Sequence, residues 1–217
     1  MRYKNKRKKN RLFFVIVIFI AGVFIYGIFG APRNILGGDQ AKIQQALNDN
    51  EKYINDKTGG DHDSTKSYKH LVAIGDSVML GAAKDMMDQM PGITVDAKES
   101  RQLFSIEAIL KKGKVGEKVI IGLGTNGVFD EDTFVEEMDL LKDKKVYWIN
   151  LCAPTTTWET SINETISEMG KKYNNLTIID WKSEGSKHPK WFYEDQIHLN
   201  MEGRKGYAAF IKKSIDQ

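Results

Sequence analysis

Short apolar runs and amphipathic segments alternate along this chain from Lys69 onward. Runs rich in β-branched and aromatic residues predict strands, and apolar residues at helical spacing predict helices. The predicted strands are His70 to Gly75, Ile93 to Ala97, Lys118 to Leu123, Lys145 to Leu151 and Leu176 to Asp180, with helices at about 78–90, 104–112, 131–142, 160–174 and 201–215. Runs such as VIIGL and VYWINL are apolar on both faces, which is typical of parallel strands covered by helices on both sides. We therefore expect a three-layer α/β/α domain with a five-stranded parallel sheet.

The longest apolar run lies near the N-terminus. Residues 12–30 carry no charge, and a helix of nineteen residues is about as long as a bilayer core is thick. Seven Lys and Arg residues precede the run within residues 1–11. By the positive-inside rule, the pattern predicts a basic cytoplasmic flank at 1–11, a transmembrane signal-anchor at 12–30 and an exported remainder. A cleaved secretory signal is the alternative, and it exports the main domain equally.

A mostly polar segment, residues 31–68, separates this run from the α/β pattern. Within it, residues 39–55 place Ile43, Ala46, Leu47 and Ile54 at rough helical spacing, which predicts a short amphipathic helix. The following stretch is polar and contains a Gly pair, as a flexible tether does, and we interpret its His62 as a solvated loop residue. We expect a linker at 31–68 and the folded domain at 69–217.

Charge and cysteine content narrow the functional classes. The 217 residues carry a net charge of +3, with a pI near 8.7, but after residue 11 there are 25 basic against 29 acidic residues, a net charge of −4. The basic pI therefore does not indicate a nucleic-acid-binding protein. Such a protein needs its positive charge on the folded domain, and here it lies in residues 1–11. The single cysteine, Cys152, rules out an intramolecular disulfide and a Cys-rich zinc site, and we interpret it as a small buried hydrophobe.

Polar residues follow the first and third predicted strands, where ligands bind in open parallel sheets. Gly75-Asp76-Ser77 leads into a helix, and Ser77 at this turn is a candidate nucleophile, although Ser is also a common helix N-cap. Gly124 and Gly127 flank Asn126, whose amide could stabilise an oxyanion if the glycines allow a tight turn with positive φ. The alternative for Asn126 is an ordinary Asn-Gly turn.

A third polar segment precedes the last helix. It contains Asp195 and His198, three residues apart. A histidine can act as a base near neutral pH, and an aspartate can orient it. The alternative is that Asn200 caps the last helix and His198 is merely solvated.

The three segments in this order resemble the SGNH, or GDSL, family of serine hydrolases and acyltransferases. The resemblance covers roughly residues 69–215 and implies a flavodoxin-like fold and an acyl-serine mechanism. It implies Ser77 as nucleophile, His198 as base and Asp195 as its partner, with an oxyanion hole formed by Ser77, Ser100 and Asn126. Ser100, in the second segment at 96–102, stands where the family has glycine. Its N–H can still serve if the turn does not require a positive φ.

Finer similarity extends to GDSVM, KESRQ, the loop of Pro154 and Trp158, and residues 188–208. These segments look like the extracellular domain of bacterial peptidoglycan O-acetyltransferases. The resemblance implies O-acetylation or deacetylation of a cell-wall glycan, with Gly124, Pro154 and Trp158 as substrate-binding residues and no metal or cofactor. The expected reactants are an acyl ester donor and a glycan or water acceptor. A separate multi-span membrane acyltransferase would be a partner, and the chain would lie in the membrane of a Gram-positive-type bacterium with its catalytic domain outside.

Two other functions are open on the sequence. One is a secreted carboxylesterase or lipase-like hydrolase acting on small acyl esters. The other is a non-catalytic wall-binding module, favoured by the altered second segment and by the aromatic residues Trp181, Trp191, Phe192 and Tyr193, since aromatic side chains can stack on sugars. We interpret His70 and His188 as structural.

Overall fold

A computed structural model describes residues 38–58, 67–111 and 116–217. The chain divides into two compact units, residues 1–41 and 42–217, and the strands described here belong to the second. The elements are α2 (Gly38–Thr58), β1 (Leu71–Gly75), α3 (Ser77–Gln89), β2 (Thr94–Ala97), the 3-10 turn η1 (Leu103–Ser105), α4 (Ile106–Lys111), β3 (Lys118–Gly122), α5 (Glu131–Leu140), β4 (Lys145–Ile149), α6 (Glu159–Lys172), β5 (Leu176–Ile179), α7 (Trp181–Ser186), the 3-10 turn η2 (Pro189–Trp191) and α8 (Met201–Ile215).

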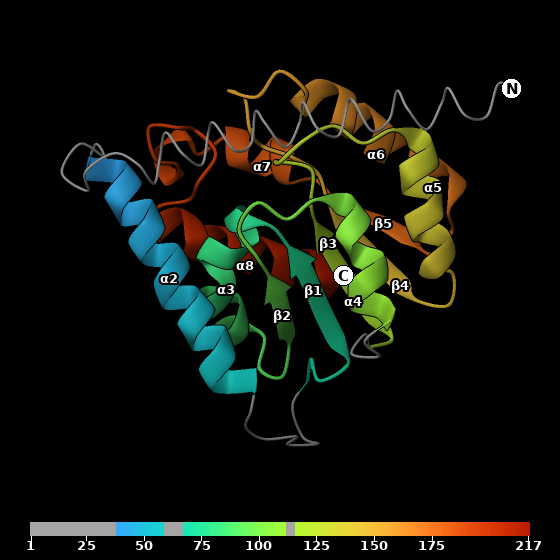
Figure 1. The fold of residues 1–217 in the computed structure, drawn as a ribbon, viewed down its shortest axis with the longest axis horizontal. Helices are drawn as coiled ribbons and strands as arrows, with labels where there is room; N and C mark the ends of the chain where they lie inside the picture. The colour runs from blue at the N-terminus through green and yellow to red at the C-terminus, as the bar shows by residue number, and fades with distance from the viewer. Residues whose placement is uncertain (1–37, 59–66, 112–115) are drawn as a thin grey trace, which may run out of the picture. The chain divides into compact units, whose positions relative to one another are not determined.

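The five strands form one parallel sheet in the order β2-β1-β3-β4-β5 (Figure 1). The predicted five-stranded parallel sheet is therefore confirmed. This is the flavodoxin-like order, in which successive strands are added first on one side of β1 and then on the other. The order reverses between β1 and β3, so the fold places its ligand-binding crevice beyond the carboxyl ends of these two strands.

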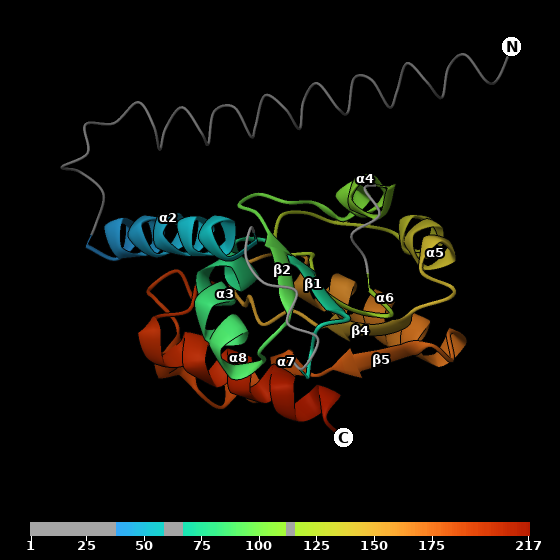
Figure 2. The same cartoon turned by 90° about the horizontal axis from the view of Figure 1, so that it is seen from below.

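Two hydrophobic cores cover the two faces of the sheet. Alternate strand residues such as Ala73 and Ile120 pack with α3 and α8, while their neighbours Ile74 and Ile121 pack with α4, α5 and α6. Figure 2 shows the sheet between these two groups of helices. Burial on both faces explains why the central strands are apolar at nearly every position.

Two paired glycines bring α3 close to the sheet at the reversal point. Gly75 at the end of β1 lies in register with Gly122 at the end of β3. A Cβ atom at Gly75 would lie 2.4 Å from the Cβ of Met79, and one at Gly122 would lie 2.9 Å from its Cε. The first turn of α3 can therefore sit directly over the ends of both strands only because both positions lack a side chain.

The loop after β5 contains two elements that the sequence analysis missed, α7 and η2. Asp180, predicted as the last strand residue, is instead the N-cap of α7, and its Oδ1 accepts a hydrogen bond from Ser183 N at 3.1 Å. Trp181 is only 2% exposed and packs edge-on against Tyr207 with ring centroids 4.8 Å apart. Trp181 therefore has a core role, the commoner one for such rings, and its ring is not placed to stack on a sugar.

The linker predicted at 31–68 is partly wrong. Helix α2 is longer than predicted, extends over residues 56–58 of the predicted tether, and from Lys42 belongs to the same compact unit as the sheet. Its Ile43 and Leu47 pack against Leu80 of α3. The boundary predicted at residue 69 was too late, because apolar spacing alone does not reveal whether a helix has a surface to pack on.

The predicted N-terminal flank and membrane span, at 1–11 and 12–30, lie outside the described residues, as does His62. Within the described ranges, no helix is both long and apolar enough to cross a bilayer.

Candidate active site

Ser77, His198 and Asp195 form a hydrogen-bonded chain. Nε2 of His198 lies 2.9 Å from Oγ of Ser77, and its Nδ1 lies 2.7 Å from Oδ2 of Asp195. Ser77 is the first residue of α3, whereas the other two lie in the loop between η2 and α8. The fold thus brings together three predicted residues, of which Ser77 and His198 are 121 positions apart. The interpretation of His198 as merely solvated is wrong.

Asp76, rather than Ser77, caps α3. Oδ1 of Asp76 accepts a hydrogen bond from Val78 N at 3.0 Å, and its own N–H donates to the Gly122 carbonyl at 3.2 Å. The alternative interpretation of Ser77 as the N-cap is therefore wrong, and its hydroxyl is left to interact with His198. Ser77 is 5% exposed, so this hydroxyl lies at the floor of a recess rather than on an open surface.

The backbone around Asp195 holds its carboxylate in place. Oδ1 accepts hydrogen bonds from Ile197 N and His198 N, both at 2.9 Å, while Oδ2 faces the imidazole. Gln196 adopts φ +56° to close this turn. Burial acts to raise the pKa of Asp195, but the hydrogen bonds from the His198 ring and from the two backbone N–H groups outweigh it, so the pKa lies below its usual value. Asp195 is thereby kept ionised to face the imidazole.

Asn200 caps α8, as the alternative interpretation of this segment proposed. Its Oδ1 accepts hydrogen bonds from Glu202 N and Gly203 N, both at 3.1 Å. The cap fixes where the chain enters α8, two residues after His198, and so helps to position the imidazole. Capping by Asn200 is therefore compatible with His198 acting as the base.

The second and third polar segments meet beside Ser77. Gly124 and Gly127 have φ values of +131° and +144°, as predicted for a tight turn. Nδ2 of Asn126 donates to the Arg101 carbonyl at 3.3 Å, and Nη2 of Arg101 pairs with Oδ1 of Asp96 at 2.6 Å. The Asn126 amide is thereby oriented by the segment that contains Ser100.

Ser100 adopts the conformation that the sequence analysis left open. Its φ is +57°, in a turn in which Arg101 N donates to the Lys98 carbonyl at 3.3 Å. A positive φ at the third residue of such a turn favours glycine. The turn therefore does require the left-handed conformation, and Ser100 adopts it despite its side chain.

The predicted substrate-binding residues serve the local structure. The Trp158 indole N–H donates to the Gly124 carbonyl at 3.1 Å, which ties the loop after β4 to the turn after β3. Pro154 is exposed in the same loop. None of the three lines the pocket that contains Ser77 and His198, and their contact with substrate stays a prediction.

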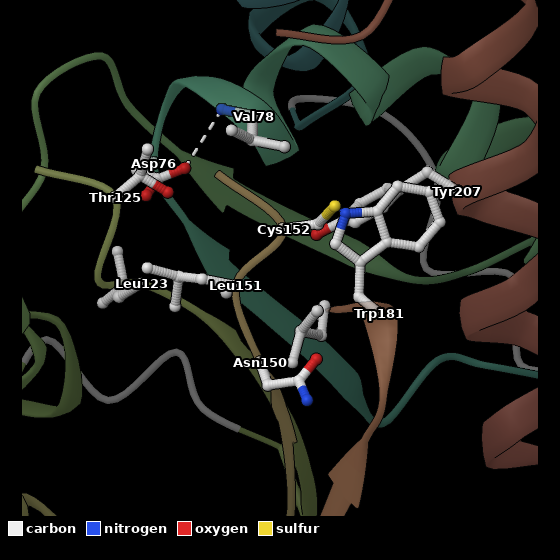
Figure 3. Close-up of a pocket in the computed structure, with 11 residues that line it drawn as sticks. Asp76, Val78, Leu123, Thr125, Asn150, Leu151, Cys152, Trp181 and Tyr207 are labelled. Carbon is white, nitrogen blue, oxygen red and sulfur yellow. Dashed lines mark hydrogen bonds between the residues drawn. The ribbon is translucent and has the colours of Figure 1, made fainter. Parts of the chain in front are cut away.

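Two pockets flank Ser77. One contains Ser77 and His198 together with α2 side chains, among which are Ile43 and Leu47. The other lies under the carboxyl ends of β3 and β4, with Asp76 and Thr125 on one side and Trp181 and Tyr207 on the other (Figure 3). Helix α2 thus belongs to the site, although its sequence predicts a linker.

Asp76 is a buried carboxylate next to the nucleophile. It is 1% exposed. Burial raises its pKa to about 6, against the lowering effects of the Val78 N–H, of Thr125 and of the nearby His198. The sequence signal for Asp76 was its position just before a helical pattern, where Asp is a favoured N-cap.

His70, His188 and Cys152 do not line the pocket that contains Ser77 and His198. The His188 ring stacks on Trp191 at 3.8 Å, as expected for a structural residue, and His70 is exposed where the chain enters β1. Cys152 is buried, as predicted, and burial raises the pKa of its thiol. Across the described ranges, no group of three or more His, Cys, Asp or Glu side chains is placed to hold a metal ion.

Comparison with known proteins identifies relatives of this chain. No family model matches it. It is 33% identical over 148 residues to the O-acetyltransferase OatA of Staphylococcus aureus, a match that covers 66% of this chain and 24% of that protein. The chain thus spans about a quarter of the length of the curated relatives it matches.

Solved structures share its fold. The C-terminal catalytic domain of Streptococcus pneumoniae peptidoglycan O-acetyltransferase A, with a methylsulfonyl adduct, superposes with a TM-score of 0.61 at 22% identity, covering 67% of this chain and 92% of that one. A carbohydrate esterase family 3 protein from Talaromyces cellulolyticus gives 0.55 at 14% identity, covering 68% and 96%. On sequence, the α/β domain of this chain is homologous to the C-terminal domains of peptidoglycan O-acetyltransferases, and its fold is the α/β/α fold of an SGNH-type catalytic domain.

Proposed function

We propose that this protein transfers an acetyl group from an ester donor to a hydroxyl of a cell-wall glycan, peptidoglycan in the first place, through an acyl-serine intermediate. The observation that carries the proposal is the chain from Ser77 Oγ to His198 Nε2 and from His198 Nδ1 to Asp195 Oδ2, at 2.9 and 2.7 Å. This arrangement supports nucleophilic acyl transfer. The relatives named as O-acetyltransferases support acetyl as the transferred group, and the one named as a peptidoglycan O-acetyltransferase supports peptidoglycan as the acceptor.

In the first half of the reaction, Ser77 becomes acylated. Its Oγ bonds to the carbonyl carbon of the donor while its proton passes to Nε2 of His198. The negative charge of Asp195 stabilises the imidazolium and holds the Nδ1 hydrogen toward itself. The donor's ester C–O bond then breaks, and His198 returns the proton to the departing alkoxide.

In the second half, the acceptor resolves the acyl-enzyme. A glycan hydroxyl gives its proton to His198, its oxygen bonds to the acyl carbon, and the bond to Ser77 Oγ breaks as the serine regains a proton. If water takes this place, the products are a free acid and the free enzyme, and the protein is an esterase. The same side chains serve both acceptors, so the outcome depends on which one reaches the intermediate.

For the oxyanion hole we propose the N–H groups of Ser77 and Ser100 and the side-chain amide of Asn126. Ser100 is included although its turn requires a positive φ, because it adopts that conformation with φ +57° and keeps its backbone N–H. An amide nitrogen carries two hydrogens, and only one is directed to the Arg101 carbonyl. The second is free to donate to the developing oxyanion, which such donors stabilise.

The setting of the reaction belongs to the same proposal. The apolar run at 12–30, preceded by seven basic residues, supports a membrane-anchored chain with its domain outside. Relatives from Staphylococcus aureus and Listeria monocytogenes support a Gram-positive-type cell envelope. A separate multi-span acyltransferase is proposed as the source of acetyl groups at the outer face.

The test is to incubate the full-length chain with an activated acetyl ester, with and without chitooligosaccharide, and to measure acetylated sugar and free acetate by mass spectrometry. We expect acetylated sugar with the wild type, and a loss of at least about a thousandfold in turnover for Ser77→Ala. Ser167→Ala, which replaces an exposed serine on α6, is the matched control and should leave turnover unchanged. Wild-type turnover in Ser77→Ala would contradict the mechanism, and acetate without acetylated sugar would assign the esterase reaction.

A non-catalytic wall-binding module is the weaker candidate. Its main support was the aromatic cluster, but Trp181 is buried and Trp191 is stacked between Trp181 and His188. Rings used in this way have little surface left to stack on a sugar.

A further inference from the structure

We infer that helix α2 forms one wall of the pocket that holds the acyl group of the substrate, and that Ala46 and Leu47 thereby set the acyl chain length the enzyme accepts. The inference rests on the proposed function, since it concerns the acyl-serine intermediate at Ser77. It assigns a specificity role to a segment that lies between the predicted membrane anchor and the sheet.

The pocket opens directly beside the reacting atoms. The space between its lining residues, counted together with the part open to solvent, is about 200 Å³. It is lined by Ile43, Ala46, Leu47, Ser77, Val78, Gly81, Tyr193, His198, Leu199 and Arg204. Three of these residues come from α2, at spacings of three and four that place them on one face of the helix. A group attached to Ser77 Oγ on this side therefore meets α2.

The lining favours an alkyl group over a sugar. Its walls are the aliphatic side chains of α2 with those of Val78 and Leu199. Its charged group, Arg204, is already engaged, because its Nε donates to the Leu199 carbonyl at 2.9 Å and its Nη2 to the Tyr193 hydroxyl at 3.2 Å. A sugar would leave its hydroxyls without partners against the aliphatic walls, at a cost that a short acyl chain does not incur.

The wall is held firmly in place. Asn50 of α2 is 7% exposed, and its side chain crosses to α3, donating to the Gly81 carbonyl at 3.1 Å and accepting from Lys84 N at 2.8 Å. Leu47, one turn earlier on α2, packs on Leu80. A wall fixed by both polar and apolar contacts can discriminate between chain lengths, because it cannot move away from a longer chain without breaking them.

The experiment compares p-nitrophenyl acetate, butyrate and hexanoate as donors for the full-length chain. Leu47→Ala enlarges the pocket, and we expect the ratio of kcat/KM for hexanoate over acetate to rise about tenfold, the scale on which apolar pockets discriminate methylene groups. Ala46→Leu fills the pocket and should lower the same ratio about tenfold. Ile54→Ala is the matched control, because Ile54 packs α2 on the core but does not line the pocket, so the ratio should stay unchanged.

Two results would overturn the inference. One is an unchanged ratio in both Ala46→Leu and Leu47→Ala with thermal unfolding intact. The other is an unchanged ester ratio with an altered dependence on chitooligosaccharide concentration, which would place the acceptor against α2. If Leu47→Ala does not fold, Ala46→Leu alone decides. Failure of the proposed function is recognised separately, because Ser77→Ala would then retain wild-type turnover of p-nitrophenyl acetate.

Discussion

At the residue scale, Asp76 combines two roles that oppose each other. As the N-cap of α3 it stabilises the helix that carries Ser77, and a negative charge is favourable at a helix N-terminus. As a carboxylate buried away from water, it destabilises the folded state whenever it is ionised, because burial outweighs its hydrogen bonds to Val78 and Thr125. A buried carboxylate with a strongly raised pKa, one residue from the proposed nucleophile, is typical of functional sites.

The raised pKa of Asp76, about 6 in the folded protein, predicts how stability depends on pH. Below about pH 4 the carboxyl is neutral in both states. As the pH rises toward 6, it ionises in the unfolded chain first, so the free energy of unfolding falls, by about 3 kcal/mol in all. Above pH 6 the loss is constant. Asp76→Asn should remove this loss, so we expect thermal unfolding at pH 7.5 to occur at a higher temperature in the variant and at pH 4 to be nearly equal.

Asp130→Asn is the matched control for Asp76→Asn. Asp130 caps α5 in the same way, but it is exposed and hydrogen bonds from Thr133 lower its pKa. Its substitution should reduce stability slightly at pH 7.5 rather than increase it. A fall in the unfolding temperature of Asp76→Asn at pH 7.5 would mean that the ionised cap stabilises α3 by more than its burial costs.

The positive φ of Ser100 predicts that replacing this residue with glycine makes the protein more stable. Its φ of +57° costs a residue with a Cβ about 1–2 kcal/mol, while the greater freedom of glycine in the unfolded chain costs about 0.5–1 kcal/mol. We expect Ser100→Gly to raise the free energy of unfolding, measured in urea, by about 0.5–1 kcal/mol. Its neighbour Glu99 has no positive φ, so Glu99→Gly should lower it. A loss of stability in both variants would contradict the assignment of strain to Ser100.

At the scale of elements, α2 shows how a helix of low apolar content becomes part of the domain. One face, at Ile43, Ala46, Leu47 and Asn50, is buried, and the opposite face is exposed. A helix this polar is marginal by itself in water, so its packing on α3 determines its stability. Two hydrogen bonds join Asn50 to the backbone of α3, and because they are specific to Gly81 and Lys84 they fix the position of α2 along α3.

Removing the Asn50 side chain should therefore loosen α2. Each hydrogen bond to α3 contributes about 1 kcal/mol, and the better helix propensity of alanine returns about 0.5 kcal/mol, so we expect Asn50→Ala to lower the free energy of unfolding by about 1–2 kcal/mol. Asn48→Ala is the matched control, since Asn48 is exposed on the same helix and bonds only within it, to Gln44. Equal effects of the two substitutions in chemical denaturation would show that Asn50 does not hold α2 to the domain.

At the scale of the whole molecule, the distribution of charge along the sequence predicts how the chain is oriented in the membrane. A basic flank and an uncharged run of nineteen residues precede a domain of opposite net charge. We expect the full-length chain in the membrane fraction, with its C-terminal domain cleaved by protease added outside intact protoplasts. Replacing Ile18 and Val23 with lysine costs about 2.5–3.5 kcal/mol per residue at the centre of the span and should release the chain from the membrane.

The control for this prediction replaces Ile18 and Val23 with leucine, which keeps the run apolar and should leave the chain in the membrane. Recovery of the wild-type domain in the medium with a new N-terminus after residue 30 would instead identify a cleaved secretory signal. Protection of the domain from external protease would contradict the predicted orientation.

Local patterns in the sequence determined the architecture of the sheet, and the resemblance of three polar segments to the SGNH family identified the proposed triad. The central strands are apolar at nearly every position, which only a sheet covered on both faces explains, and strand ends are where such sheets bind ligands. Ser77, Asn126 and His198 became candidates because each follows a strand or precedes a helix, but each had an ordinary structural alternative, and only the resemblance of the three segments together to the SGNH family assigned their roles. The short helix α7 was missed, because it is only six residues long and its cap, Asp180, continues an apolar run.

Tertiary structure alone decided three further features. The burial of Asp76 depends on segments that pack on it from elsewhere in the chain, and the positive φ of Ser100, a position that the sequence marked only by its resemblance to a family glycine, was decided by the folded turn. The same holds for α2, which forms one wall of the Ser77 pocket although its sequence resembles a linker. Periodicity reports which face of a segment is apolar, whereas burial and strain depend on what the folded chain places against that face.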